Sequence, residues 1–104
     1  MKKIYNKLVR DKIPEIIEKN GDKCVTEILE NDKYEECLIQ KLDEELKEFK
    51  ESKEPEELAD LLEVVYALAE LHGASERKLN SIRTKKKRER GGFAKKILLV
   101  EAGE

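Results

Sequence analysis

Apolar residues recur every three or four positions along much of the chain, the spacing of amphipathic helices. This pattern predicts one long helix over residues 33–50 and another over 55–71. A proline at position 14 and a serine at position 75 predict a short helix over 14–19 and a fourth over 76–90. Breaks at 20–21, 52–55, 72–73 and 91–92 separate these helices. The expected fold is therefore mainly α, a helical bundle.

Two short segments have a different pattern. Residues 23–29 are partly alternating and contain β-branched side chains, and residues 97–100 are a continuous apolar run. Together they could form a small two-stranded β accessory beside the helices.

The composition indicates a folded domain with a thin core. Of the 104 residues, 44% are charged and 5% are aromatic, and the formal net charge is −2. Leu, Ile, Val and Phe contribute 28 residues, a larger share than in disordered chains. A core of this size is marginal alone, so we expect a homodimer or higher homo-oligomer that buries more apolar surface.

The sequence argues against several other classes of protein. No apolar stretch approaches the roughly 20 residues that span a membrane, and the N-terminus lacks the apolar segment of a secretory signal. Cys24 and Cys37 are the only cysteines and lack CxxC spacing, which favours free thiols in a reducing cytoplasm. No nucleic-acid partner is expected, because the net charge is −2 and no aromatic residue interleaves with the basic tract KKKRER.

The charged residues are strongly segregated along the chain. Residues 27–63 contain 15 acidic and 5 basic residues, whereas residues 77–96 contain 1 acidic and 10 basic residues. Two solvated helix faces would explain such runs. A site that holds metal cations and a polyanion would explain them as well, and helical phase helps to decide between the two.

Several carboxylates fall where helical phase predicts contact with the core. In the long helix, Glu45 lies at the edge of the apolar stripe with Glu48 beside it, whereas Glu44 points to solvent. In the following helix, Glu57 lies inside the apolar arc and Asp60 lies at its border. An unpaired carboxylate that faces a core is costly, so each needs a cation or a shifted pKa.

Antiparallel packing of these two helices would bring the pairs Glu45/Glu48 and Glu57/Asp60 face to face. Four convergent carboxylates suit a hard cation such as Mg²⁺ or Mn²⁺. Ordinary surface glutamates, or ion pairs with Lys and Arg, are the alternative explanation. The apolar flank of Glu45 should raise its pKa, so Glu45 is our candidate general base.

The basic helix directs part of its charge toward its few apolar residues. The cations on that side are Arg83, Lys86 and Arg90, whereas Lys85 and Arg88 point elsewhere. The inward set could clamp phosphate oxygens, or could form salt bridges with the carboxylates of the preceding helices.

This combination resembles the all-α NTP pyrophosphohydrolase superfamily, the MazG-like proteins, whose hallmark looks like EExxE followed by ExxD on the next helix. Here the motifs are Glu44-Glu45-x-x-Glu48 in KLDEELKEF and Glu57-x-x-Asp60 in EELADLLEV. The start, YNKLVRDKIPEII, and the end, RERGGFAKKILL, are similar to a small branch described as predicted house-cleaning pyrophosphatases for noncanonical nucleotides. The resemblance covers nearly the whole chain, as a single domain over residues 1–104.

The resemblance implies a homo-oligomeric helical bundle that uses Mg²⁺ to hydrolyse an NTP to an NMP and pyrophosphate. It implies metal ligands at Glu45, Glu48, Glu57 and Asp60. It also implies phosphate or nucleotide contacts at Arg83, Lys86 and Arg90, more weakly at Asn80, and at the N-terminal Lys7, Arg10, Asp11 and Lys12.

Two alternatives stay open at this point. The segment EELADLL also resembles phosphoribosyl-ATP pyrophosphohydrolase of histidine biosynthesis, a relative with the same metal motif. A non-catalytic helical interaction module would use the same amphipathic helices without a metal, although it would leave Glu57 inside an apolar arc without a reason.

Overall fold

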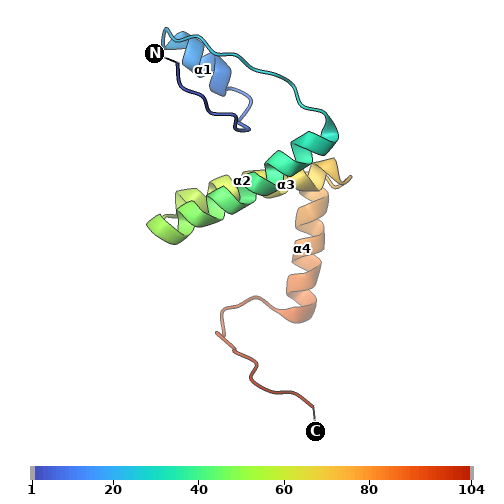
Figure 1. Ribbon diagram of the computed structural model, residues 1–104. Coiled ribbons are helices and arrows are strands. Elements are labelled where there is room, and N and C mark those ends of the chain that lie inside the picture. Colours follow the sequence, from blue (N-terminus) through green and yellow to red (C-terminus); the bar gives the residue numbers. More distant parts are fainter. Residues whose placement is uncertain (1, 104) are drawn as a thin grey trace.

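A computed structural model describes residues 2–103 and has four α-helices in that range (Figure 1). They are α1 (Ile13–Lys19), α2 (Asn31–Ser52), α3 (Pro55–Leu71) and α4 (Glu76–Arg90). The predicted mainly α fold is therefore confirmed. Helix α3 has its predicted bounds, whereas α2 begins and ends two residues beyond the predicted range.

The centre of the molecule is a hairpin of α2 and α3. Only Lys53 and Glu54 separate the two helices, and Lys53 takes a left-handed backbone conformation (φ 59°) that ends α2 and reverses the chain. Helices joined by so short a connection pack antiparallel. Leu38 of α2 and Val64 of α3 are the buried apolar side chains within residues 2–103, at 3% and 8% exposed.

The connection from α3 to α4 is tightly specified. Gly73 supplies a positive φ of 88° after α3, and the Ala74 amide donates a 2.8 Å hydrogen bond to the carbonyl of Ala69, which closes a Schellman motif. Ser75 then caps α4, because its Oγ accepts a 3.1 Å hydrogen bond from the Lys78 amide. Helix α4 consequently leaves the hairpin at a steep angle (Figure 1).

The two candidate strands do not form. Residues 23–29 and 97–100 are extended, but no strand is present within residues 2–103. Val25 is 101% exposed and Leu98 is 84% exposed. The two segments lie on opposite sides of the hairpin, in a body 64 Å long (Figure 1). A strand needs a neighbour about 4.8 Å away, and neither segment has one.

Outside the hairpin, few elements pack on one another. Helix α1 packs against no other helix of residues 2–103, whereas α2 packs on α3 and α3 on α4. Within the same range, no helix is both long and apolar enough to cross a bilayer. The N-terminal segment that precedes α1 nevertheless reaches the hairpin, and this contact builds one wall of the site described next.

Candidate metal and phosphate site

The hairpin brings three of the four candidate metal ligands together. Glu45 from α2 and Glu57 and Asp60 from α3 each offer one carboxylate oxygen, and these oxygens all lie within 4.8 Å of one another. Their helical phase causes this convergence, because each residue lies on or beside the face that packs on the partner helix. The spacing is compatible with a single cation bound by all three.

Glu45 is the buried member of this carboxylate cluster. It is 7% exposed, and its Oε2 atom has no hydrogen-bond partner. Its other oxygen, Oε1, lies 3.8 Å from the ammonium group of Lys41, one turn earlier on α2. A buried carboxylate oxygen without a donor is costly, so this atom has an unfilled capacity to bind a cation or a proton.

Burial raises the pKa of Glu45, and the neighbouring carboxylates of Glu48 and Asp60 raise it further, while Lys41 acts in the opposite direction. Partial desolvation raises the pKa of Glu57, and the negative charges of Glu48 and Asp60 add to the effect. Both carboxylates are thus partly desolvated, and they also lie among more negative charge than their protein neighbours neutralise.

Glu48, the fourth candidate ligand, lies just outside the three-residue cluster. It is exposed, although it is close enough to raise the pKa of both Glu45 and Glu57. The prediction that Glu44 points to solvent is wrong. Its side chain is 29% exposed and lies 3.8 Å from Lys41 and 3.9 Å from Lys7, because the N-terminal segment covers this side of α2.

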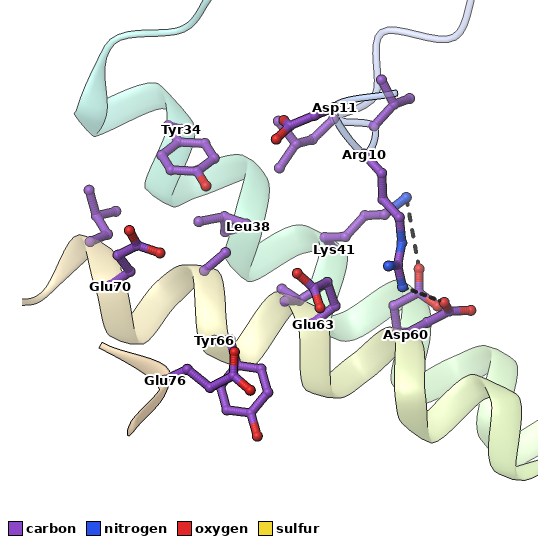
Figure 2. A pocket seen from close by; sticks show the side chains of 16 residues that line it. Arg10, Asp11, Tyr34, Leu38, Lys41, Asp60, Glu63, Tyr66, Glu70 and Glu76 are labelled. Carbon is purple, nitrogen blue, oxygen red and sulfur yellow. Dashed lines mark hydrogen bonds and ion pairs between the residues drawn. The ribbon is translucent and has the colours of Figure 1, made fainter. Parts of the chain in front are cut away.

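An open pocket of about 620 Å³ begins at the cluster and extends along the hairpin (Figure 2). Glu45, Asp60, Arg10 and Lys41 line one part of it, and its wall also includes the apolar or aromatic residues Tyr34, Leu38, Tyr66 and Leu71. This volume is within the range of about 300–1,000 Å³ typical of small-molecule sites. Further carboxylates, those of Asp11, Glu63, Glu70 and Glu76, also line the pocket, so a ligand there would meet negative charge along its length beside the apolar surface.

Of the N-terminal candidates, Arg10 and Asp11 line this pocket, whereas Lys12 lines neither of the two pockets described. Figure 2 shows Arg10 reaching from the segment before α1 to Asp60 on α3, where Nη2 lies 2.7 Å from Oδ1. Asp11 lines the same pocket, whereas Lys7 lines a smaller neighbouring one beside Glu44. The positions of Arg10 and Asp11 agree with a role near a ligand, which the sequence alone could not separate from ordinary surface charge.

The α4 candidates are not brought to the cluster within one chain. Arg83, Lys86 and Arg90 are exposed and line neither of these two pockets. Asn80 is engaged elsewhere, since both atoms of its amide lie 3.2–3.3 Å from the hydroxyl of Tyr66. Because α4 leaves the hairpin at a steep angle, its phase alone did not determine what its cations face.

Lys41 was missed as a site residue. It contacts both Glu44 and Glu45 and lines the pocket. Its position four residues before Glu45 was the available signal, because side chains at that spacing are neighbours on a helix. The sequence offered no comparable indication that Tyr34 and Tyr66 line the pocket, since either ring could equally have been buried in the core.

The chain was compared with known protein families, curated proteins and solved structures, and none of them matches it.

Proposed function

We propose that the protein is a Mg²⁺-dependent nucleoside triphosphate pyrophosphohydrolase, which converts an NTP and water to an NMP and pyrophosphate. Mn²⁺ would serve in place of Mg²⁺. The substrates we propose are noncanonical nucleotides, which the cell removes by such hydrolysis. This is the activity that the EExxE and ExxD motifs imply by resemblance.

One observation supports the metal site above all others: the convergence of Glu45, Glu57 and Asp60 within 4.8 Å, with a buried and unpartnered oxygen on Glu45. Acidic clusters at a surface are common without any ion. A carboxylate oxygen that is buried without a donor is not, because it has lost its hydration without replacement. All-oxygen ligand sets suit Mg²⁺ and Mn²⁺.

The residues present fit such a cation, with Glu45, Glu57 and Asp60 as ligands and Glu48 close by. When bound, the metal would offset the phosphate charge and lower the pKa of a coordinated water. The protein's own groups have further roles. Glu45, whose pKa burial raises, would accept a proton from the attacking water. The apolar part of the pocket would hold the nucleoside.

The assembly and the compartment belong to the same proposal. Ile39 and Leu46 on α2, and Leu58 and Leu62 on α3, are each 44–49% exposed, which supports a homodimer or higher homo-oligomer formed through the hairpin.

Cys24 and Cys37 are free thiols, which supports a cytoplasmic location.

Pyrophosphate release from a panel of nucleotides tests the proposal. The panel should contain canonical, deaminated and oxidised NTPs together with phosphoribosyl-ATP, each assayed with millimolar Mg²⁺. We expect hydrolysis that EDTA abolishes, with noncanonical NTPs turned over best. Best turnover of phosphoribosyl-ATP would instead assign the alternative activity.

Variants separate this site from a contaminating activity. Glu45→Gln, Glu57→Gln and Asp60→Asn should each lower turnover by orders of magnitude, since each removes one ligand charge without changing side-chain size. Glu51→Gln is the matched control, because Glu51 is an exposed glutamate of α2 outside the cluster. Full activity in any of the three site variants, or no hydrolysis of any nucleotide by the native protein, would refute the proposal and favour a non-catalytic module.

A further inference from the structure

Two cations of the pocket are held by the carboxylates of the cluster itself. The guanidinium of Arg10 lies 2.7 Å from Asp60, and the ammonium of Lys41 lies 3.8 Å from Glu45. Glu45 and Asp60 are themselves within 4.8 Å of each other, so the two cations lie over neighbouring carboxylates of the same group (Figure 2). Both cations line the pocket, and among residues 2–103 they are its only basic side chains, since its other charged lining residues are carboxylates.

Arg10 holds a carboxylate that a metal ion would also use, whereas Lys41 contacts Oε1 of Glu45 and leaves its Oε2 without a partner. A carboxylate oxygen that accepts a hydrogen bond from a guanidinium has less electron density and less space for a divalent cation. Arg10 and a metal bound at Asp60 would therefore compete, and binding of one would disfavour the other. The competition is strongest for Arg10, because its 2.7 Å contact is a full charge-assisted hydrogen bond, whereas the 3.8 Å contact of Lys41 is an ion pair only.

Arg10 is also the more exposed of the two cations. It lies in the segment before α1, which has no regular secondary structure, and its side chain is 56% exposed. Lys41 by contrast projects from the middle of α2 and is 27% exposed. The pair thus combines a more exposed cation from an irregular segment with a less exposed cation from a helix.

We propose that Arg10 and Lys41 are the phosphate-binding pair of this site, and that Arg10 passes from Asp60 to the substrate's polyphosphate once a divalent cation has taken the carboxylates. This inference rests on the proposed function and assigns the phosphate contacts within one chain. The planar guanidinium matches two phosphate oxygens at once, and the ammonium adds a point charge. The pair lies at the cluster, where the metal would bring the same phosphates.

A different role for Arg10 would be to orient Asp60 permanently as a metal ligand. The two roles predict opposite effects on metal affinity. If Arg10 competes with the metal, its removal strengthens metal binding. If Arg10 orients Asp60, its removal weakens metal binding, as loss of a hydrogen bond to a ligand ordinarily does.

The first experiment measures Mn²⁺ alone, by the loss of its free-ion EPR signal on binding. We expect Arg10→Gln to bind Mn²⁺ about fivefold more tightly than the native protein, since an exposed ion pair no longer has to break. Lys2→Gln removes the same charge from the same exposed segment away from the pocket, and it controls for long-range attraction. If Arg10→Gln binds Mn²⁺ as well as the native protein or more weakly, the proposal that Arg10 leaves Asp60 when the metal binds is overturned.

The second experiment measures binding of inorganic pyrophosphate at saturating Mn²⁺, by calorimetry. Arg10→Gln and Lys41→Gln should each weaken it about tenfold or more, because each removes a charge-assisted contact. Arg10→Lys keeps the positive charge but loses the planar guanidinium that can contact two oxygens. Its pyrophosphate affinity should therefore lie between those of the native protein and Arg10→Gln. Unchanged pyrophosphate affinity in both Gln variants overturns the phosphate assignment. Absence of Mn²⁺ binding in the native protein would instead refute the metal site of the proposed function, and this inference with it.

Discussion

At Glu45, burial and the negative charge of neighbouring carboxylates both act against the ionised form of the side chain. It is the only charged residue among the buried ones described, and one of its oxygens has no partner. The surrounding carboxylates act on it in the same direction as burial, so its ionised form is disfavoured in the folded protein without a cation. Stability and cation binding are therefore linked at this residue.

The pH dependence of the free energy of unfolding should show that ionised Glu45 is disfavoured in the folded protein. Because the folded pKa of Glu45 is raised above its ordinary value of 4.5, the folded state holds the proton more tightly than the unfolded state. The resulting stabilisation is complete below pH 4.5 and is lost as the pH rises through the raised pKa. Metal-free native protein should therefore lose unfolding free energy over this range relative to Glu45→Gln, as urea denaturation at several pH values would measure. Parallel curves for the two proteins would contradict the assignment.

Added metal should reverse the destabilisation at neutral pH. A ligand that binds only the folded state stabilises it by mass action, by about 2.7 kcal/mol at a hundredfold excess over its Kd. We expect millimolar Mg²⁺ to raise the melting temperature of metal-free protein more than NaCl of matched ionic strength does. Glu57→Gln and Asp60→Asn should lose most of this increment, and an equal increment in those variants would place the effect outside the cluster.

At the scale of elements, the turn between α3 and α4 decides which way the basic helix points. The Schellman motif at Gly73 and the Ser75 cap fix the start of α4, and the contact between Tyr66 and Asn80 joins its first turns to α3. Beyond these residues α4 has no buried side chain. Its direction therefore depends on a few contacts at one end.

Loss of the cap should measurably destabilise α4. Ser75→Ala removes the acceptor of the Lys78 amide, and such substitutions cost about 1 kcal/mol, within a range of roughly 0.5–2. Urea denaturation monitored by helicity would detect it. Ser81→Ala is the matched control, since Ser81 is exposed inside α4 and alanine is the better helix former there, so its effect should be neutral or stabilising.

Neutralising any single cation of α4 should change the rate of hydrolysis only slightly. Helical phase predicts a greater loss for Lys86→Ala than for Lys85→Ala. Both side chains are exposed and outside the pocket at the cluster, so we expect equal, modest and salt-sensitive losses of kcat/KM from long-range attraction. A much larger loss for Lys86→Ala at moderate salt would show that α4, from this copy or another, contacts the substrate.

At the scale of the whole molecule, the chain exposes more surface than a compact monomer should. Its accessible surface is 10076 Å², against about 6,000 Å² expected for a folded monomer of 12.1 kDa. The radius of gyration is 18.3 Å, against about 13 Å for a compact chain of this length. Two chains would together carry about 8,000 Å² of such excess surface, more than the roughly 2,000–5,000 Å² that most obligate homodimers bury in total.

Self-association should be measurable and should depend on the hairpin. Light scattering should give a mass that is a multiple of 12.1 kDa, and the melting temperature should rise with protein concentration. Leu46→Glu combined with Leu62→Glu should lower the mass, because each places a charge on a half-exposed apolar row. Lys47→Glu, at an exposed position beside Leu46, controls for charge. A monomeric native protein at all concentrations would contradict this prediction.

Much of the local structure followed from the sequence because its causes are local. Pro55, Gly73 and Ser75 mark helix ends through backbone geometry and hydrogen bonds within a few residues. Helical phase also placed Glu45 and Asp60 near the core, since 100° per residue is a property of the helix itself. The convergence of the cluster needed one further assumption, that α2 and α3 pack antiparallel, which their short connection nearly guarantees.

What only the tertiary structure decided involves contacts between segments distant in sequence. The N-terminal segment covers one side of α2, so Glu44 meets Lys7 and Arg10 meets Asp60, 50 residues away. The extended segments 23–29 and 97–100 do not pair, because the intervening helices hold them on opposite sides of the hairpin (Figure 1). The face of α4 that is apolar in sequence has nothing to pack on beyond its first turns. Periodicity determines which residues share a face, but what that face meets depends on long-range packing.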